Sequence, residues 1–170
     1  MALPAAGTVG QNFVMLPAPV SKMVQTSVTT TLTYTDVQGL PTDFLFSAGT
    51  VTQTTRITVT PTVAIWSLGN QFFAGHAFDL TAAMAQSFSL PVTVTLRYSD
   101  ADLHVIADES ALTLSWWTGS QWVDAGTTCP SASVYDRDVV SNILKVAVCR
   151  TGRYALFGPT HQSYLPLVRR

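Results

Sequence analysis

The densest group of side chains that could do chemistry is acidic and lies between residues 100 and 109. Asp100 and Asp102 form an Asp-x-Asp turn, and Asp108 and Glu109 follow shortly after. Calcium binds about six to eight oxygens, mostly from carboxylates and carbonyls, so Asp100, Asp102 and Asp108 are a weak candidate calcium site. Asp is also an ordinary turn residue, because its side chain binds the local backbone, and the glycine of an EF-hand loop is missing. We therefore favour the turn interpretation and predict neither a metal nor a cofactor.

Residues of the types used in catalysis are scattered. His76, His104 and His161 show no zinc-binding spacing such as His-Glu-x-x-His. The residue order is compatible with a Ser-His-Asp site, but no Gly-x-Ser-x-Gly motif supports one. We predict that the protein is not an enzyme.

Two tryptophans form a candidate binding surface. If the chain turns at Gly119 and Ser120, Trp117 faces Trp122 across a hairpin, and alternation along the strands points both rings away from the core. Such a pair could hold a sugar ring or a segment of a partner protein. Alternatively, the rings stabilise their own hairpin, by roughly 0.5–1.5 kcal/mol beyond the burial of their area.

The two cysteines predict a disulfide. Cys129 and Cys149 are 20 residues apart and do not form a Cys-x-x-Cys motif. Thr and Ser stand where a cytosolic protein would carry Lys and Glu, which favours an extracellular compartment in which disulfides persist. The alternative is a pair of buried thiols in neighbouring strands.

The low charge of the chain excludes several classes of protein. Charged residues make up 11% of the 170 residues, against about 25% in an average protein, and the net charge is −1. No basic excess can neutralise phosphates, so we expect no nucleic-acid partner. A membrane-spanning helix needs about 18 consecutive apolar residues, and no apolar run approaches that length. Hydrophobic residues make up 47% of the chain, which is too many for a disordered protein.

The N-terminus leaves two compartments open. Residues 1–7 lack the basic start and the apolar stretch of a signal peptide. Either the protein is cytoplasmic, or it is secreted or held at the cell surface after removal of its signal peptide. The composition favours the second interpretation.

The elements that must position these residues are strands. Apolar and polar residues alternate, with turn residues in between, through residues 28–34, 43–46, 55–60, 92–98 and 143–148. Residues 81–86 have helix propensity but are too few for more than a turn or two of helix. We predict an all-β, antiparallel β-sandwich over residues 21–159. An extended N-terminal arm, residues 1–20, and a C-terminal tail, residues 160–170, would flank it.

A similarity between two segments of the sequence, which we call the echo, raises the alternative that the chain consists of two related β halves, 21–87 and 88–159. Residues 28–36 and 92–100 agree at six of nine positions, and each segment ends in an Asp-led turn. Convergence explains the same match, because strands rich in Thr and Val are alike and the match does not continue past the turn.

Several motifs of the second half occur in a familiar order. They are VTVTLRYSDADL at 92–103, DESAL at 108–112, WTGSQWV at 117–123 and YALF at 154–157. Over residues 88–158 this order resembles the ZU5/GAIN-like β-sandwich modules of bacterial secreted and cell-surface proteins. The resemblance implies an Ig-like or ZU5-like sandwich and a non-enzymatic module.

Some members of that family cut themselves at a His-Phe-Ser-type site before the last strand. Here Arg150 stands where the histidine would be, and Gly152 stands at the position of the nucleophile. Arginine stays protonated and does not act as a base, so the resemblance implies no self-cleavage in this chain.

Both ends of the chain are candidate assembly arms. The apolar residues are Val14, Met15 and Leu16 in the arm and Tyr164, Leu165 and Leu167 in the tail. The tail resembles short C-terminal ends of bacterial secreted proteins, which implies a sorting or attachment element; the alternative is a flexible apolar terminus.

We predict a structural function from these features together. Few charges resist association, and Lys, which often protects strand edges, occurs only twice. The expected protein is a non-catalytic subunit that assembles with copies of itself or with other surface proteins into a filament, surface layer or multidomain adhesin. The alternative is a carbohydrate- or protein-binding module that uses Trp117 and Trp122.

Overall fold

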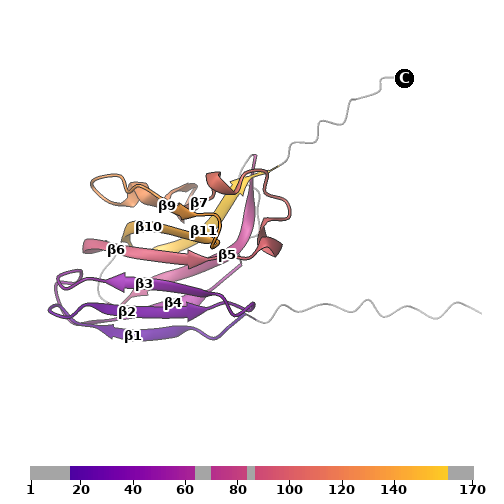
Figure 1. The fold of residues 1–170 in the computed structure, drawn as a ribbon. Helices are drawn as coiled ribbons and strands as arrows, with labels where there is room; N and C mark the ends of the chain where they lie inside the picture. Colours follow the sequence, from indigo (N-terminus) through magenta and orange to yellow (C-terminus); the bar gives the residue numbers. More distant parts are fainter. Residues whose placement is uncertain (1–15, 64–69, 84–86, 161–170) are drawn as a thin grey trace, which may run out of the picture.

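The computed structural model describes residues 16–63, 70–83 and 87–160 of the chain, and these form two antiparallel sheets packed face to face (Figure 1). The six-stranded sheet has the order β1 (Val20–Val24), β4 (Thr55–Pro61), β5 (Gln71–Ala82), β11 (Gly152–Pro159), β7 (Thr113–Trp117) and β8 (Trp122–Asp124). The five-stranded sheet has the order β2 (Thr30–Thr35), β3 (Pro41–Phe46), β6 (Ser87–Arg97), β10 (Ile143–Arg150) and β9 (Asp136–Asp138). The predicted all-β sandwich is confirmed.

Period-two alternation explains which side chains face the core. In β2, Thr30, Leu32 and Tyr34 are buried and the residues between them are exposed. Such a strand can present only one face to the core, because successive side chains point to opposite sides. The space between the sheets is filled by large side chains that are 0–1% exposed, among them Phe44, Phe46, Phe78, Leu96 and Leu156. Each contributes roughly 1.5–3 kcal/mol through its burial.

Strands from both parts of the sequence share both sheets. In the six-stranded sheet β5 pairs with β11, and in the five-stranded sheet β3 pairs with β6. Residues 21–87 and 88–159 therefore bury one common core. The two echo strands, β2 and β6, lie on either side of β3 and run in the same direction, since both are antiparallel to it.

The segment at residues 81–86, for which at most a turn or two of helix was expected, begins as a strand. Thr81 and Ala82 continue β5, where they pair with Thr58 and Ile57 of β4. Pairing with β4 outweighs local helix propensity, which is weak over so few residues. Residues 84–86 lie outside the described part of the chain. The helical turns that are described are the three short 3-10 segments η1 (Asp100–Leu103), η2 (Glu109–Ala111) and η3 (Ala125–Thr128).

The predicted disulfide is confirmed. Cys129 directly follows η3 and bonds to Cys149 of β10, with the two Cα atoms 4.8 Å apart. Beside it, the backbone N–H of Cys149 donates a hydrogen bond to the side-chain hydroxyl of Thr128. These two links hold η3 against the five-stranded sheet.

Candidate functional site

The three carboxylates of the weak candidate calcium site have different partners. Asp100 accepts a hydrogen bond from the side-chain amide of Asn142 at 2.8 Å. Asp108 caps η2 by accepting from the backbone N–H and the hydroxyl of Ser110. Asp102 turns to the interior. Within the described ranges, no group of three His, Cys, Asp or Glu side chains is placed to hold a metal ion.

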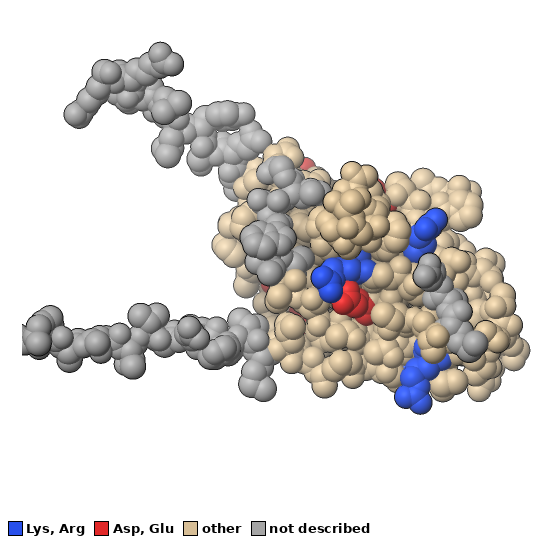
Figure 2. All heavy atoms as spheres, turned by 180° about the vertical axis from the view of Figure 1, so that it is seen from behind, with Lys and Arg blue, Asp and Glu red and all other residues tan. Residues whose placement is uncertain are grey.

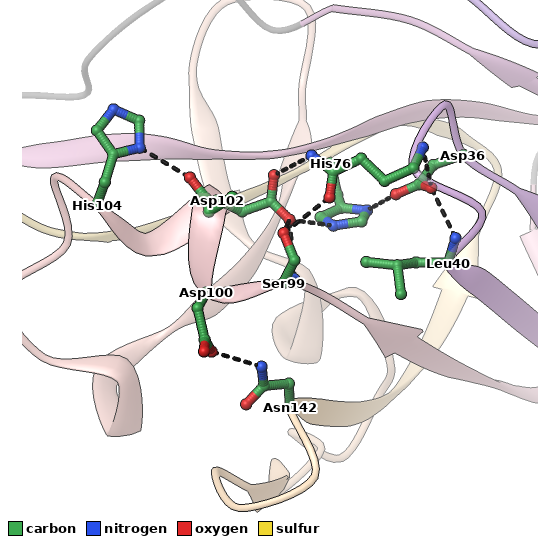
Figure 3. A network of polar contacts seen from close by, with 10 residues as sticks. Asp36, Leu40, His76, Ser99, Asp100, Asp102, His104 and Asn142 are labelled. Carbon is green, nitrogen blue, oxygen red and sulfur yellow. Dashed lines mark hydrogen bonds and ion pairs between the residues drawn. The ribbon is translucent and has the colours of Figure 1, made fainter.

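Asp102 instead belongs to a buried cluster, which we call the His76 clasp (His76, Asp36 and Asp102; Figure 3). His76 lies on β5 and is 4% exposed. Its Nδ1 lies 3.7 Å from an oxygen of Asp36, and its Nε2 lies 3.4 Å from an oxygen of Asp102. One imidazole therefore bridges two carboxylates inside the sandwich.

Three separate elements supply the clasp. Asp36 begins the turn between β2 and β3, where its Oδ1 accepts from the backbone N–H groups of Gln38 and Leu40. Asp102 belongs to η1, directly after β6. Because β2 and β6 run in the same direction on either side of β3, their turns emerge at the same end of the sheet. The opposite sheet contributes β5, so the clasp ties the two sheets together.

Hydrogen bonds favour the charged form of Asp102. Its Oδ2 accepts from the backbone N–H of Ser99 at 2.9 Å and from the Ser99 hydroxyl at 2.7 Å, and its Oδ1 accepts from the side chain of Gln38. Burial opposes ionisation, but the close contact with His76 and the hydrogen bonds from Ser99 outweigh it and lower the pKa of Asp102 to about 2. Nearby, burial and the charge of Asp36 raise the pKa of Tyr34 to about 12.

A glycine allows Asp102 to approach β5. Gly75 has φ +78°, a conformation that side-chain-bearing residues rarely adopt, and a Cβ atom at this position would overlap the Asp102 carboxylate. Close approach and backbone conformation therefore both require glycine beside His76.

We expect Gly75→Ala to lower the free energy of unfolding by about 2–4 kcal/mol, since it adds left-handed strain to a clash with a buried carboxylate. Chemical denaturation measures the loss. Gly39→Ala is the matched control, because Gly39 has φ +83° but open space around it. Equal losses in the two variants would contradict the role given to the Asp102 contact.

The clasp borders a cavity of about 200 Å³. Its lining includes Tyr34, Asp36, Gln38 and His76, and Leu16 lies at its edge. The hydroxyl of Ser99, which lies beside the clasp, bonds to Asp102 and to Gln38. The clasp thus joins the β2–β3 turn, β5 and η1.

Sequence reasoning missed the clasp. His76 is a single histidine in a strand, and such a residue carries no pattern of its own. The echo between residues 28–36 and 92–100 was the available signal, because it marks two like strands whose turns bring Asp36 and Asp102 to one end of the sheet.

The expected geometry of the Trp117–Trp122 pair is confirmed. The two residues face each other in the register of β7 and β8, and their ring centroids are 5.4 Å apart. Gly119 turns the hairpin with φ +101°, and the N–H of Thr118 bonds to the carbonyl of Gln121. Both rings are half-buried, and Trp122 packs edge-on against Phe157 at 5.3 Å. The pair thus lies on the outer face of the six-stranded sheet and stabilises that face.

The candidate assembly arms lie almost entirely outside the described residues. This applies to Val14, Met15, Tyr164, Leu165 and Leu167. Leu16 is described and is 42% exposed at the edge of the cavity beside the clasp.

The surface shows the low charge of the sequence. Figure 2 shows one face on which a few charged groups interrupt a wide uncharged area. On the outer face of the six-stranded sheet, Arg153 donates two hydrogen bonds to Asp79, at 2.8 and 2.9 Å. Charges paired in this way do little to repel an approaching partner.

No protein-family model matches the chain, and no curated protein is significantly similar to it in sequence. In the described part of the chain, no helix has the length and apolar character needed to cross a membrane.

Proposed function

We propose that this protein is a non-catalytic, secreted or cell-surface β-sandwich subunit that self-associates through a strand edge into a filament, surface layer or multidomain adhesin. The disulfide supports an oxidising compartment, since such bonds persist outside the cytosol. The observation that carries the proposal is the contrast between the two lateral edges of the sandwich.

One lateral edge is long and carries one lysine on its edge strands. It consists of β1 and β2, the two longest edge strands, which lie side by side in Figure 1. Lys22 of β1 reaches across this edge and donates to the backbone carbonyl of Thr31 at 2.8 Å. Met23 beside it is 48% exposed. An edge strand presents backbone groups to which a strand of another molecule can add.

The opposite edge is short and held in place. Here β8 and β9 have three residues each. Two nitrogens of Arg137 donate to the carbonyl of Leu112, and Lys145 pairs with Asp136 at 3.1 Å. Short, charged edges discourage strand addition, so the β1–β2 edge is the better site for association.

We also propose kinship with ZU5/GAIN-like modules, on the order of motifs in residues 88–158; the two-sheet fold is compatible with it. This kinship is consistent with a non-catalytic role at the cell surface. We expect no self-cleavage, because Arg150 stands at the position of the histidine that would act as the base.

We expect the wild-type protein to associate as its concentration rises, and the double variant Thr33→Lys with Thr35→Lys to raise the dissociation constant at least about tenfold, because lysines on an edge strand repel a second copy. Sedimentation velocity over a concentration series measures this.

Lysines on an inner strand of the same sheet provide the control. Thr33 of β2 and Thr95 of β6 both pair with Asp43 of β3, from opposite sides. Thr93→Lys with Thr95→Lys therefore adds equal charge to the same face without touching the edge. A wild-type protein that stays monomeric, or a control as disruptive as the edge variant, would count against edge assembly.

A second candidate function is a binding module that uses the Trp117–Trp122 pair for a glycan or a partner protein. The partly exposed rings favour it, since aromatic faces stack well on apolar faces of ligands. Binding of a sugar that is lost in Trp117→Ala would support this function.

A further inference from the structure

A second cavity lies where the β3–β4 loop meets the start of β6. The His76 clasp lies at the opposite end of β3, beside the β2–β3 turn. The second cavity has a volume of about 300 Å³, at the lower end of the range of small-molecule sites. Its polar lining is uncharged and consists of Thr50, Thr52, Gln53, Thr55, Ser87 and Ser89. The ring of Phe88 adds an apolar wall.

Two of the lining residues carry buried hydroxyls without a hydrogen-bond partner in the described part of the chain. Thr50 is 0% exposed and Thr55 is 4% exposed, and the Oγ1 atom of each is unpaired there. A buried polar group without a partner costs roughly 1–3 kcal/mol, so a folded protein seldom keeps two of them at one place without a use.

The backbone around the cavity is firmly held. The N–H of Thr50 bonds to the carbonyl of Ser47, and the carbonyl of Thr50 accepts from the N–H of Ser89 at 2.9 Å. Thr55 begins β4 and pairs with Val24 of β1. The two threonines are therefore held on a fixed backbone, which lowers the entropy lost when a ligand is ordered against them.

We propose that this cavity binds a small uncharged polyol, specifically a single sugar residue. Each hydroxyl of Ser or Thr can donate one hydrogen bond and accept two, which matches the mixed donors and acceptors of a sugar. An ionic ligand would find no opposite charge in this lining. An apolar ligand would leave the hydroxyls unpaired. This site goes beyond the proposed assembly function and is separate from the Trp pair.

The test is a titration of the full chain with D-glucose, D-galactose, D-mannose and N-acetyl-D-glucosamine, followed by NMR of the threonine methyl groups. At least one sugar should shift the Thr50 and Thr55 methyl signals in a saturable way. Thr50→Val removes the hydroxyl at nearly constant volume and should weaken that binding about tenfold. Trp117→Ala should leave it unchanged.

A second variant, Thr55→Val, guards against a folding defect in the first, and the methyl spectrum of each ligand-free variant shows whether it is folded. Three results would overturn the proposal: no saturable shift with any of the four sugars, shifts confined to the Trp117–Trp122 hairpin, or equal affinity in the wild type and both valine variants. The last result would mean that water, rather than a sugar, pairs with the two hydroxyls. Because assembly is measured without sugar, failure here leaves the edge proposal standing.

Discussion

Asp102→Asn is expected to lower the free energy of unfolding by about 2 kcal/mol near neutral pH. The variant keeps the size of the side chain but removes the charge that His76 faces and that the N–H and hydroxyl of Ser99 stabilise. The magnitude follows from the pKa of Asp102, which falls from 3.8 to about 2 on folding. Urea denaturation of the two proteins measures the difference.

The same substitution should change how stability depends on acid. Because folding lowers the pKa of Asp102, its contribution is complete above the ordinary carboxyl pKa and is lost as the pH falls through about 2. The wild-type protein should therefore lose this part of its stability between about pH 4 and pH 2, and the variant should lose correspondingly less.

Asp108→Asn is the matched control for this experiment. Asp108 also caps a 3-10 segment, but it is exposed and lies outside the His76 clasp. Because Asn caps nearly as well as Asp, we expect the control to change stability by only a few tenths of a kcal/mol. If Asp108→Asn matched Asp102→Asn, the buried contact with His76 would not be the cause.

Replacing both cysteines by alanine is expected to lower the free energy of unfolding by about 3 kcal/mol. The disulfide closes a loop of 20 residues, and without it the unfolded chain gains the conformational entropy of that loop. For a chain of this size the loss corresponds to a decrease in melting temperature of about 6–12 °C. Calorimetry or circular dichroism on heating measures it.

The native structure should survive the loss of the disulfide. The hydrogen bond between Cys149 and Thr128 is made by the backbone N–H of residue 149 and does not need the sulfur atom. A reductant should therefore lower the melting temperature of the wild type to that of the double variant and leave the variant unchanged. A variant as stable as the oxidised wild type would contradict the loop-entropy argument.

The local pattern of the sequence was enough to predict the strands. In β2 and β4, apolar residues or threonines alternate with exposed ones, and the period of two is a property of each strand by itself. The Trp117–Trp122 pair was predictable for the same reason, since a short turn at Gly119 sets the register of its hairpin. The disulfide followed from composition, because two cysteines allow one intramolecular pairing.

The His76 clasp and the candidate calcium site show what local sequence patterns do not predict, namely which side chains become neighbours in the folded chain. Asp100, Asp102 and Asp108 are close in sequence, but each carboxylate takes the partner that its own turn provides. The members of the clasp, Asp36, His76 and Asp102, are far apart in sequence. They meet because β2 and β6 flank β3 in one sheet and β5 of the other sheet packs against them. Threonines 50 and 55 likewise look like the other threonines of the chain until packing removes their partners.

The sequence by itself determined the all-β sandwich, the disulfide, the low surface charge and the hairpin that carries the two tryptophans. These features depend on residue type and on spacing within one strand or turn. Only the tertiary structure decided which strand edges are protected, which carboxylates surround His76 and which hydroxyls line a cavity. Those features depend on the order of strands in the sheets and on the packing of one sheet against the other, because only long-range pairing determines which residues become neighbours.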